Sequence, residues 1–174
     1  MRVVSAVVTT GAVAVAVAVA AAVSADEPPP ACAAATHRQF DFWIGDWKVY
    51  DPSGKVLGEN RIESFAGGCA LLEHWTGASG FTGKSFNIYD RNDGKWHQSW
   101  VDSVGGRLEL VGGLANDRMI LAGETRDRAK PDVIVTQRIT WSVNDDRSVR
   151  QVWESSEDGG KTWTVAFDGK YVRK

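Results

Sequence analysis

Residues 133–143 read VIVTQRITWSV, and nearly every second side chain along this stretch is apolar. Because successive side chains of a β-strand point to opposite faces, this period of two predicts a half-buried strand. The residues on the face that we expect to be buried are Val133, Val135, Gln137, Ile139 and Trp141. This stretch therefore predicts a strand that packs one face against a core.

The same alternation recurs along the chain between turn signals, and no stretch after Ala25 keeps the spacing of an amphipathic helix. The predicted strands are Trp43–Tyr50, Val56–Phe65, Cys69–Thr76, Lys84–Tyr89, Lys95–Asp102, Arg107–Val111, Arg118–Arg126, Val133–Val143, Ser148–Ser155 and Trp163–Val172. Residues 37–42 read as a helical turn that caps one end. A meander of about ten short strands commonly closes to remove its exposed edges. We predict an all-β, antiparallel up-and-down barrel, with a two-layer sandwich as the alternative.

Three of these strands place tryptophan and glutamine on the same face. A buried glutamine must find hydrogen-bond partners for its amide, so the pattern indicates a partly polar interior. One interpretation is a ligand cavity with aromatic walls. The other is a filled barrel in which indole and amide groups satisfy one another. The residues predicted to contact a ligand are Trp75, Trp96, Gln98, Trp100, Gln137, Trp141, Gln151 and Trp153.

Residues 40–54, FDFWIGDWKVYDPSG, contain Gly45-Asp46-Trp47, which resembles the G-x-W signature of lipocalins and related calycin barrels. With GGCALLEHWTG, WHQSWVD and SEDGGKTW, the chain from Arg38 to Arg173 resembles an uncharacterised family of secreted bacterial lipocalin-like proteins. This resemblance implies the barrel fold and brings no established activity. In lipocalins the tryptophan closes one end of the barrel beneath an arginine of the last strand, which implies that role for Trp47 and Arg173.

The first 25 residues have the features of a cleavable export signal. Arg2 precedes an almost uncharged Val/Ala run that ends in Val23-Ser24-Ala25, and an acidic, proline-rich segment follows. A transmembrane anchor is the alternative reading of such a run, and a lipobox is not expected because Cys32 lies beyond three prolines. We predict a signal peptide over 1–25, a proline-rich arm over 26–36 and one barrel domain over 37–174. The mature protein would be periplasmic or secreted, without membrane insertion.

The chain carries 20 basic and 22 acidic residues, for a net charge of −2, and two cysteines. A nearly balanced surface gives no reason to expect nucleic acid or an anionic membrane as a partner. An even pair of cysteines in an oxidising compartment is more often joined than free. We therefore predict a disulfide between Cys32 and Cys69, with two buried thiols as the alternative.

Neither a cofactor nor a metal is expected. Nitrobindin-like haem barrels share the architecture and imply a histidine on a late strand, but none follows His97, which lies on the predicted outer face. His37, His74 and His97 lack the spacing of metal ligands. Acidic turns such as residues 90–94 and 144–146 lack the full ligand set of a calcium loop.

Residues 156–163, SEDGGKTW, resemble the Asp-box of sialidases and other β-propellers. In those proteins the aspartate binds turn amides and the tryptophan packs against the loop, away from the active site. A propeller repeats such a motif blade by blade, whereas this chain has one copy. We therefore interpret it as a hairpin device.

The sequence favours a non-catalytic, exported barrel that binds a small, partly hydrophobic or aromatic molecule. One alternative is a hydrolase or isomerase that uses Glu73 and Asp102, because a carboxylate held against aromatic rings has a raised pKa and can act as an acid or base. An inward Arg61 would instead make Glu73 half of a salt bridge. Another alternative is a filled barrel that serves as an envelope structural or interaction module. The ligand's identity and the oligomeric state stay open.

Overall fold

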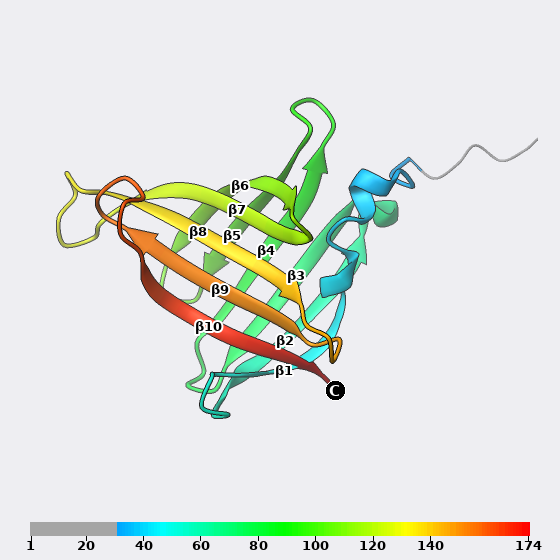
Figure 1. Cartoon of the computed structure of the whole chain (residues 1–174), viewed down its shortest axis with the longest axis horizontal. Coiled ribbons are helices and arrows are strands. Elements are labelled where there is room, and N and C mark those ends of the chain that lie inside the picture. Colours follow the sequence, from blue (N-terminus) through cyan, green and yellow to red (C-terminus); the bar gives the residue numbers. More distant parts are fainter. Residues whose placement is uncertain (1–30) are drawn as a thin grey trace, which may run out of the picture.

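The computed structural model describes residues 31–174, which form one closed barrel of antiparallel strands (Figure 1). The strands are β1 (Gly45–Tyr50), β2 (Val56–Phe65), β3 (Ala70–Gly77), β4 (Thr82–Asp90), β5 (Lys95–Asp102), β6 (Arg107–Ala115), β7 (Arg118–Arg126), β8 (Ile134–Val143), β9 (Val149–Ser156) and β10 (Thr164–Arg173). Three short 3-10 helices accompany them: η1 (Ala35–Arg38), η2 (Asp41–Trp43) and η3 (Ala66–Gly68). The predicted barrel is confirmed, and the sandwich alternative is wrong. The predicted export signal lies outside the described residues.

Closure comes from β1, which pairs with both β2 and β10. The register places Trp47 opposite Arg173, and the Arg173 guanidinium carbon lies 4.4 Å from the centroid of the Trp47 ring. Gly45 makes this stacking possible, because a Cβ at that position would collide with the Arg173 guanidinium. A cation held over an indole face is attracted by the ring quadrupole. The first and last strands are thus joined by side chains as well as by backbone pairing.

An aromatic plug fills the end of the barrel where the C-terminus lies, and helices η1 and η2 cross that end (Figure 1). Phe40 stacks on Trp43 with 4.9 Å between ring centroids and meets Trp141 edge-on at 5.1 Å. The Trp47 indole donates a hydrogen bond to the Trp43 carbonyl at 2.8 Å. All four of these side chains are fully buried. None of the helices in this part of the chain is long and apolar enough to cross a membrane.

The prediction that the first strand begins at Trp43 is wrong, since β1 begins at Gly45. The Trp43 amide donates to the Phe40 carbonyl at 3.1 Å, which closes a 3-10 turn. This turn directs the Trp43 side chain across the barrel end instead of along its wall. Helical turns are present in this region, as predicted for residues 37–42, and η2 continues one residue further, to Trp43.

The predicted disulfide between Cys32 and Cys69 is confirmed, with 5.0 Å between the two Cα atoms. It joins the arm before η1 to the residue between η3 and β3. The Arg38 side chain adds a hydrogen bond to the Gly68 carbonyl and an ion pair with Asp41 at 3.5 Å. The plug is therefore fastened to the barrel wall at the β2–β3 connection.

Candidate ligand cavity

The half of the barrel away from the plug contains a cavity of about 320 Å³. This volume falls within the range of small-molecule sites. Fourteen residues line the cavity: Leu57, Glu73, Trp75, Gly77, Ser79, Phe81, Gln98, Trp100, Leu108, Ile139, Gln151, Trp153, Phe167 and Tyr171. Ser79 and Phe81 belong to the β3–β4 connection, which lies at the end opposite the plug. The barrel is thus filled in one half and hollow in the other.

Aromatic rings form the walls of the cavity near its mouth. Trp75 and Phe167 meet almost perpendicularly, with 5.9 Å between centroids, and Phe81 lies 6.5 Å from Trp100. Gly83 leaves the space that the Trp100 indole occupies, because a Cβ there would collide with the ring. Glycine in a strand commonly marks such a close approach. The position of the Trp100 indole in the cavity wall therefore depends on the glycine at position 83 of the neighbouring strand.

Glu73 lies at the floor of the cavity and is 4% exposed. Asn60 Nδ2 donates to its Oε1 at 2.7 Å, and Ser85 Oγ donates to its Oε2 at 2.6 Å. Burial raises the pKa of the Glu73 carboxyl to about 6, because the charged form loses its hydration, while the two hydrogen bonds act in the opposite direction. The carboxyl group therefore changes its charge close to neutral pH.

A directed chain of hydrogen bonds leads to Glu73 across three strands. Gln98 Nε2 donates to Asn87 Oδ1 at 2.8 Å, and Asn87 Nδ2 donates to Ser85 Oγ at 2.9 Å. Because the Ser85 hydroxyl accepts from Asn87, its single proton is left for Glu73. Every bond of the chain thus presents a donor toward the carboxyl, which suits an ionised acceptor.

Tyr171, on β10, is a further polar residue at the cavity floor. Its hydroxyl donates to Gln151 Oε1 and accepts from Asn60 Nδ2 at 3.5 Å. Burial, together with the nearby Glu73 charge, raises the pKa of Tyr171 well above its usual value. The phenol is therefore protonated at neutral pH, and its hydroxyl donates to Gln151.

Five of the eight residues predicted to contact a ligand line the cavity: Trp75, Gln98, Trp100, Gln151 and Trp153. Trp96 and Trp141 lie instead in the buried cluster at the closed end. Gln137 accepts from the Trp153 indole at 2.7 Å and donates to Thr125 Oγ1 at 2.9 Å, so it orients a wall residue from behind. Gln98 and Gln151 thus face the hollow half of the barrel, whereas Trp96 and Trp141 fill the other half.

The two carboxylates considered for catalysis are not brought together. Asp102 does not line the cavity, and its Oδ1 accepts from the backbone amides of Val104 at 3.0 Å and Gly106 at 2.7 Å. This is the pattern of an aspartate that stabilises a turn. Arg61 pairs with Glu63 at 3.1 Å and leaves Glu73 without that partner.

Sequence reasoning missed four polar residues of the floor: Asn60, Ser85, Asn87 and Tyr171. A usable signal was present, because Asn60 shares its parity with Gly58 and Ile62 on β2. Ser85 and Asn87 likewise alternate with outward residues of β4. A polar residue on the inward face of a strand, two positions from a glycine, was therefore as informative as the Trp/Gln pattern.

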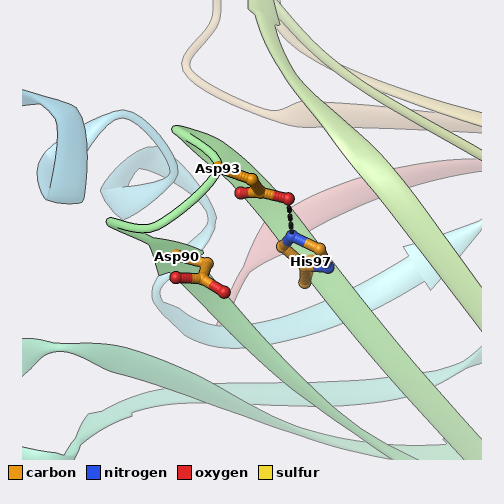
Figure 2. Close-up of side chains that lie close together, drawn as sticks. All are labelled: Asp90, Asp93 and His97. Carbon is orange, nitrogen blue, oxygen red and sulfur yellow. Dashed lines mark hydrogen bonds and ion pairs between the residues drawn. The ribbon is translucent and has the colours of Figure 1, made fainter.

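Figure 2 shows Asp90, Asp93 and His97 together on the β4–β5 hairpin, with possible ligand atoms all within 4.8 Å of one another. His97 Nε2 is hydrogen-bonded to Asp93 Oδ2 at 2.8 Å, and Asp93 Oδ1 accepts from the Lys95 amide at 3.0 Å. All three side chains are partly or fully exposed. Their hydrogen bonds stabilise the β4–β5 hairpin.

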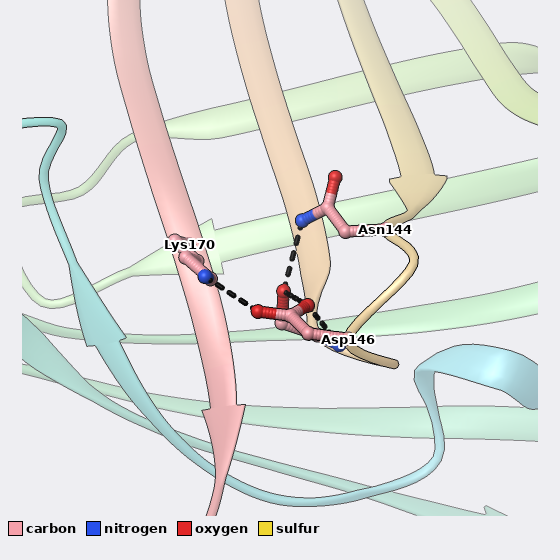
Figure 3. Close-up of polar contacts among 4 residues, drawn as sticks. Asn144, Asp146 and Lys170 are labelled. Carbon is pink, nitrogen blue, oxygen red and sulfur yellow. Dashed lines mark hydrogen bonds and ion pairs between the residues drawn. The ribbon is translucent and has the colours of Figure 1, made fainter.

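The β8–β9 turn is tied to β10 by a second surface cluster (Figure 3). Lys170 Nζ donates to Asp146 Oδ2 at 2.7 Å, and Asn144 Nδ2 donates to Ser148 Oγ at 2.9 Å. The Lys170 hydrogen bond, followed by those from Ser148, holds the pKa of Asp146 far below its usual value. This cluster lies outside the barrel and takes no part in the cavity.

The motif at residues 156–163 connects β9 to β10. Asp158 Oδ1 accepts from the backbone amides of Lys161 and Thr162, each at 2.9 Å. The Trp163 indole donates to the Gly160 carbonyl at 3.0 Å, and Arg138 covers the ring at 3.8 Å. These contacts stabilise the turn, and none of the residues named here lines the cavity.

No protein-family model matches this sequence. No curated protein matches it either. The barrel agrees with the fold that the lipocalin-like resemblance implies, while membership of that secreted family stays a prediction. The cavity is therefore the feature of the molecule that bears on its function.

Proposed function

We propose that this protein is an exported carrier that binds a small, largely apolar or aromatic molecule in the hollow half of its barrel. The observation that carries this proposal is the cavity of about 320 Å³ with Trp75, Trp100 and Trp153 in its walls and polar groups at its floor. An apolar pocket with a few convergent polar groups is the usual form of a small-molecule site. The disulfide supports export, because such bonds persist in oxidising compartments.

The geometry favours binding over the two alternatives. A filled barrel would need side chains in both halves, whereas the half away from the plug encloses space. Catalysis by paired carboxylates would need Asp102 beside Glu73, yet Asp102 is engaged in the β5–β6 turn. A carrier needs only the cavity and its polar floor.

A larger side chain in the cavity should weaken binding. Ile139 lines the cavity and Ile134 lies on the outer face of the same strand, so Ile139→Phe and Ile134→Phe are a matched pair. We expect Ile139→Phe to weaken binding of the neutral fluorescent probe N-phenyl-naphthylamine at least about tenfold, with Ile134→Phe unchanged. Probe fluorescence titrations measure both, and thermal melts check that each variant folds.

Native mass spectrometry of the protein purified from its own cell complements this titration, because it would reveal a small molecule that copurifies. If the spectrum shows no bound molecule, and no aromatic probe, neutral or charged, shows binding that Ile139→Phe weakens, the carrier proposal is wrong.

A further inference from the structure

The charge of the cavity is concentrated in one group. Among its lining residues, Glu73 is the only side chain that is charged at neutral pH. The walls around it are aromatic and aliphatic, and the remaining polar groups are the neutral Gln98, Gln151, Ser79 and Tyr171. A ligand in the cavity therefore meets a single negative charge at the floor.

No cation in the described part of the chain forms an ion pair with the Glu73 carboxyl. Within residues 31–174, all ion pairs lie among other side chains. The two hydrogen-bond partners of the Glu73 carboxyl, Asn60 and Ser85, are neutral donors. A buried carboxylate without a counter-charge is costly, and such groups are usually paired or bind a metal or ligand.

The surrounding hydrogen bonds hold this carboxyl as an acceptor. Both of its oxygens accept, and the chain from Gln98 through Asn87 and Ser85 presents donors toward it. In addition, Asn60 Oδ1 is buried without a partner in the described part of the chain, which leaves another acceptor in the same cluster. The floor thus has an excess of acceptors, which matches a ligand that brings donors and positive charge.

The walls suit a cation as well. Indole faces attract positive charge, and three tryptophans contribute to the lining. An organic cation with an apolar body would bury that body against Trp75, Trp100 and Trp153. Its charged end would then reach the floor.

Resting on the carrier function proposed above, we infer that the ligand is an organic amine, protonated at neutral pH, whose ammonium group pairs with the Glu73 carboxylate. Glu73 is then the residue that selects the ligand by charge, and the aromatic walls select it by shape. The floor would reject an anion of the same shape, because like charges repel in a poorly hydrated site.

Three probes with one aromatic body test this inference: naphthylethylamine, which is cationic, naphthylethanol, which is neutral, and naphthylacetate, which is anionic. By isothermal titration calorimetry we expect the amine to bind at least about tenfold more tightly than the alcohol, with the acetate weakest. Glu73→Gln should remove the preference for the amine and leave the alcohol within about threefold. The matched control Glu124→Gln, on an exposed position of β7, should change neither.

The pH profile of the unmodified protein supplies a second, independent test. Within residues 31–174, Tyr171 is the only other titratable group that faces Glu73, since β2, β4, β5 and β9 present Asn60, Ser85, Gln98 and Gln151. With a Glu73 pKa of about 6, the dissociation constant of the amine should rise about tenfold from about pH 7 to about pH 5, while that of the alcohol stays flat. A neutral ligand that accepts a hydrogen bond from the protonated Glu73 carboxyl would bind more tightly at the lower pH, which is the opposite trend.

The outcomes separate the two proposals. Equal binding of amine and alcohol, with a flat pH profile for both, would overturn the charge inference and leave the carrier function standing. Tightest binding of the acetate would overturn it as well. Binding of none of the three probes, nor of N-phenyl-naphthylamine, would count against the carrier function itself.

Discussion

Replacing Trp141 by alanine is expected to lower the free energy of unfolding by about 3–5 kcal/mol. Trp141 is fully buried in the plug, where it contacts Phe40 and Trp43 with ring centroids 5.1 and 5.4 Å away. Truncation leaves a large cavity beside the rings of Phe40 and Trp43. The cost therefore includes both lost burial and the empty space.

Urea unfolding followed by far-ultraviolet circular dichroism measures this loss. Trp163→Ala is the matched control, because that ring lies partly exposed on the β9–β10 turn beneath Arg138 and should cost about 1 kcal/mol or less. Ligand affinity should survive in Trp141→Ala under conditions where the variant is folded, since Trp141 does not line the cavity. A loss below about 1 kcal/mol would mean that the plug does not fill the closed end.

Stability should fall as pH rises through the titration of Glu73. The folded pKa of this carboxyl is about 6, above its ordinary value of 4.5, so the folded state holds the proton more tightly than the unfolded chain. The resulting contribution to the free energy of unfolding is fully present below about pH 4.5, and it is lost as the pH rises through about 6. The size of the loss is about 2 kcal/mol, from the difference between the two pKa values.

The difference between the unmodified protein and Glu73→Gln isolates this effect, because glutamine does not titrate. Between about pH 4 and about pH 7, the unmodified protein should lose about 2 kcal/mol relative to the variant in urea unfolding. Glu124→Gln should run parallel to the unmodified protein, because its side chain is exposed. A constant difference across the range would show that Glu73 has an ordinary pKa in the folded protein. A saturating amine should weaken the effect by stabilising the ionised form.

The number of strands and the face on which each side chain lies were predictable, because the alternation of apolar and polar residues is a local signal. In β8, Val135, Gln137, Ile139 and Trp141 all lie on the inner face, as their parity requires. The β6 strand shows where the signal fails. The predicted strand ended at Val111, yet β6 runs to Ala115 through Gly112, where a Cβ would collide with the Ile120 carbonyl of β7.

The alternation pattern also could not show which inward residues belong to the filled half of the barrel and which line the cavity. Trp96 and Trp100 share a face of β5, but Trp96 packs against Phe40 in the plug whereas Trp100 lines the cavity. The difference depends on where η2 enters the barrel, a tertiary arrangement with no period in the sequence. The catalytic alternative placed Glu73 and Asp102 in one interior, but Glu73 lies at the cavity floor whereas Asp102 ends β5 and binds the amides of the following turn.

One half of this barrel is proposed to bind a small molecule, while the other half is filled by aromatic side chains. The indole N–H resonances of the eight tryptophans report on both halves in a single nitrogen–proton correlation spectrum. On titration with naphthylethylamine, the account predicts that the resonances of Trp75, Trp100 and Trp153 shift in a saturable way. Those of the buried plug residues Trp43, Trp47, Trp96 and Trp141 should keep their positions. Saturable shifts of the plug indoles, with the three cavity indoles unmoved, would contradict it.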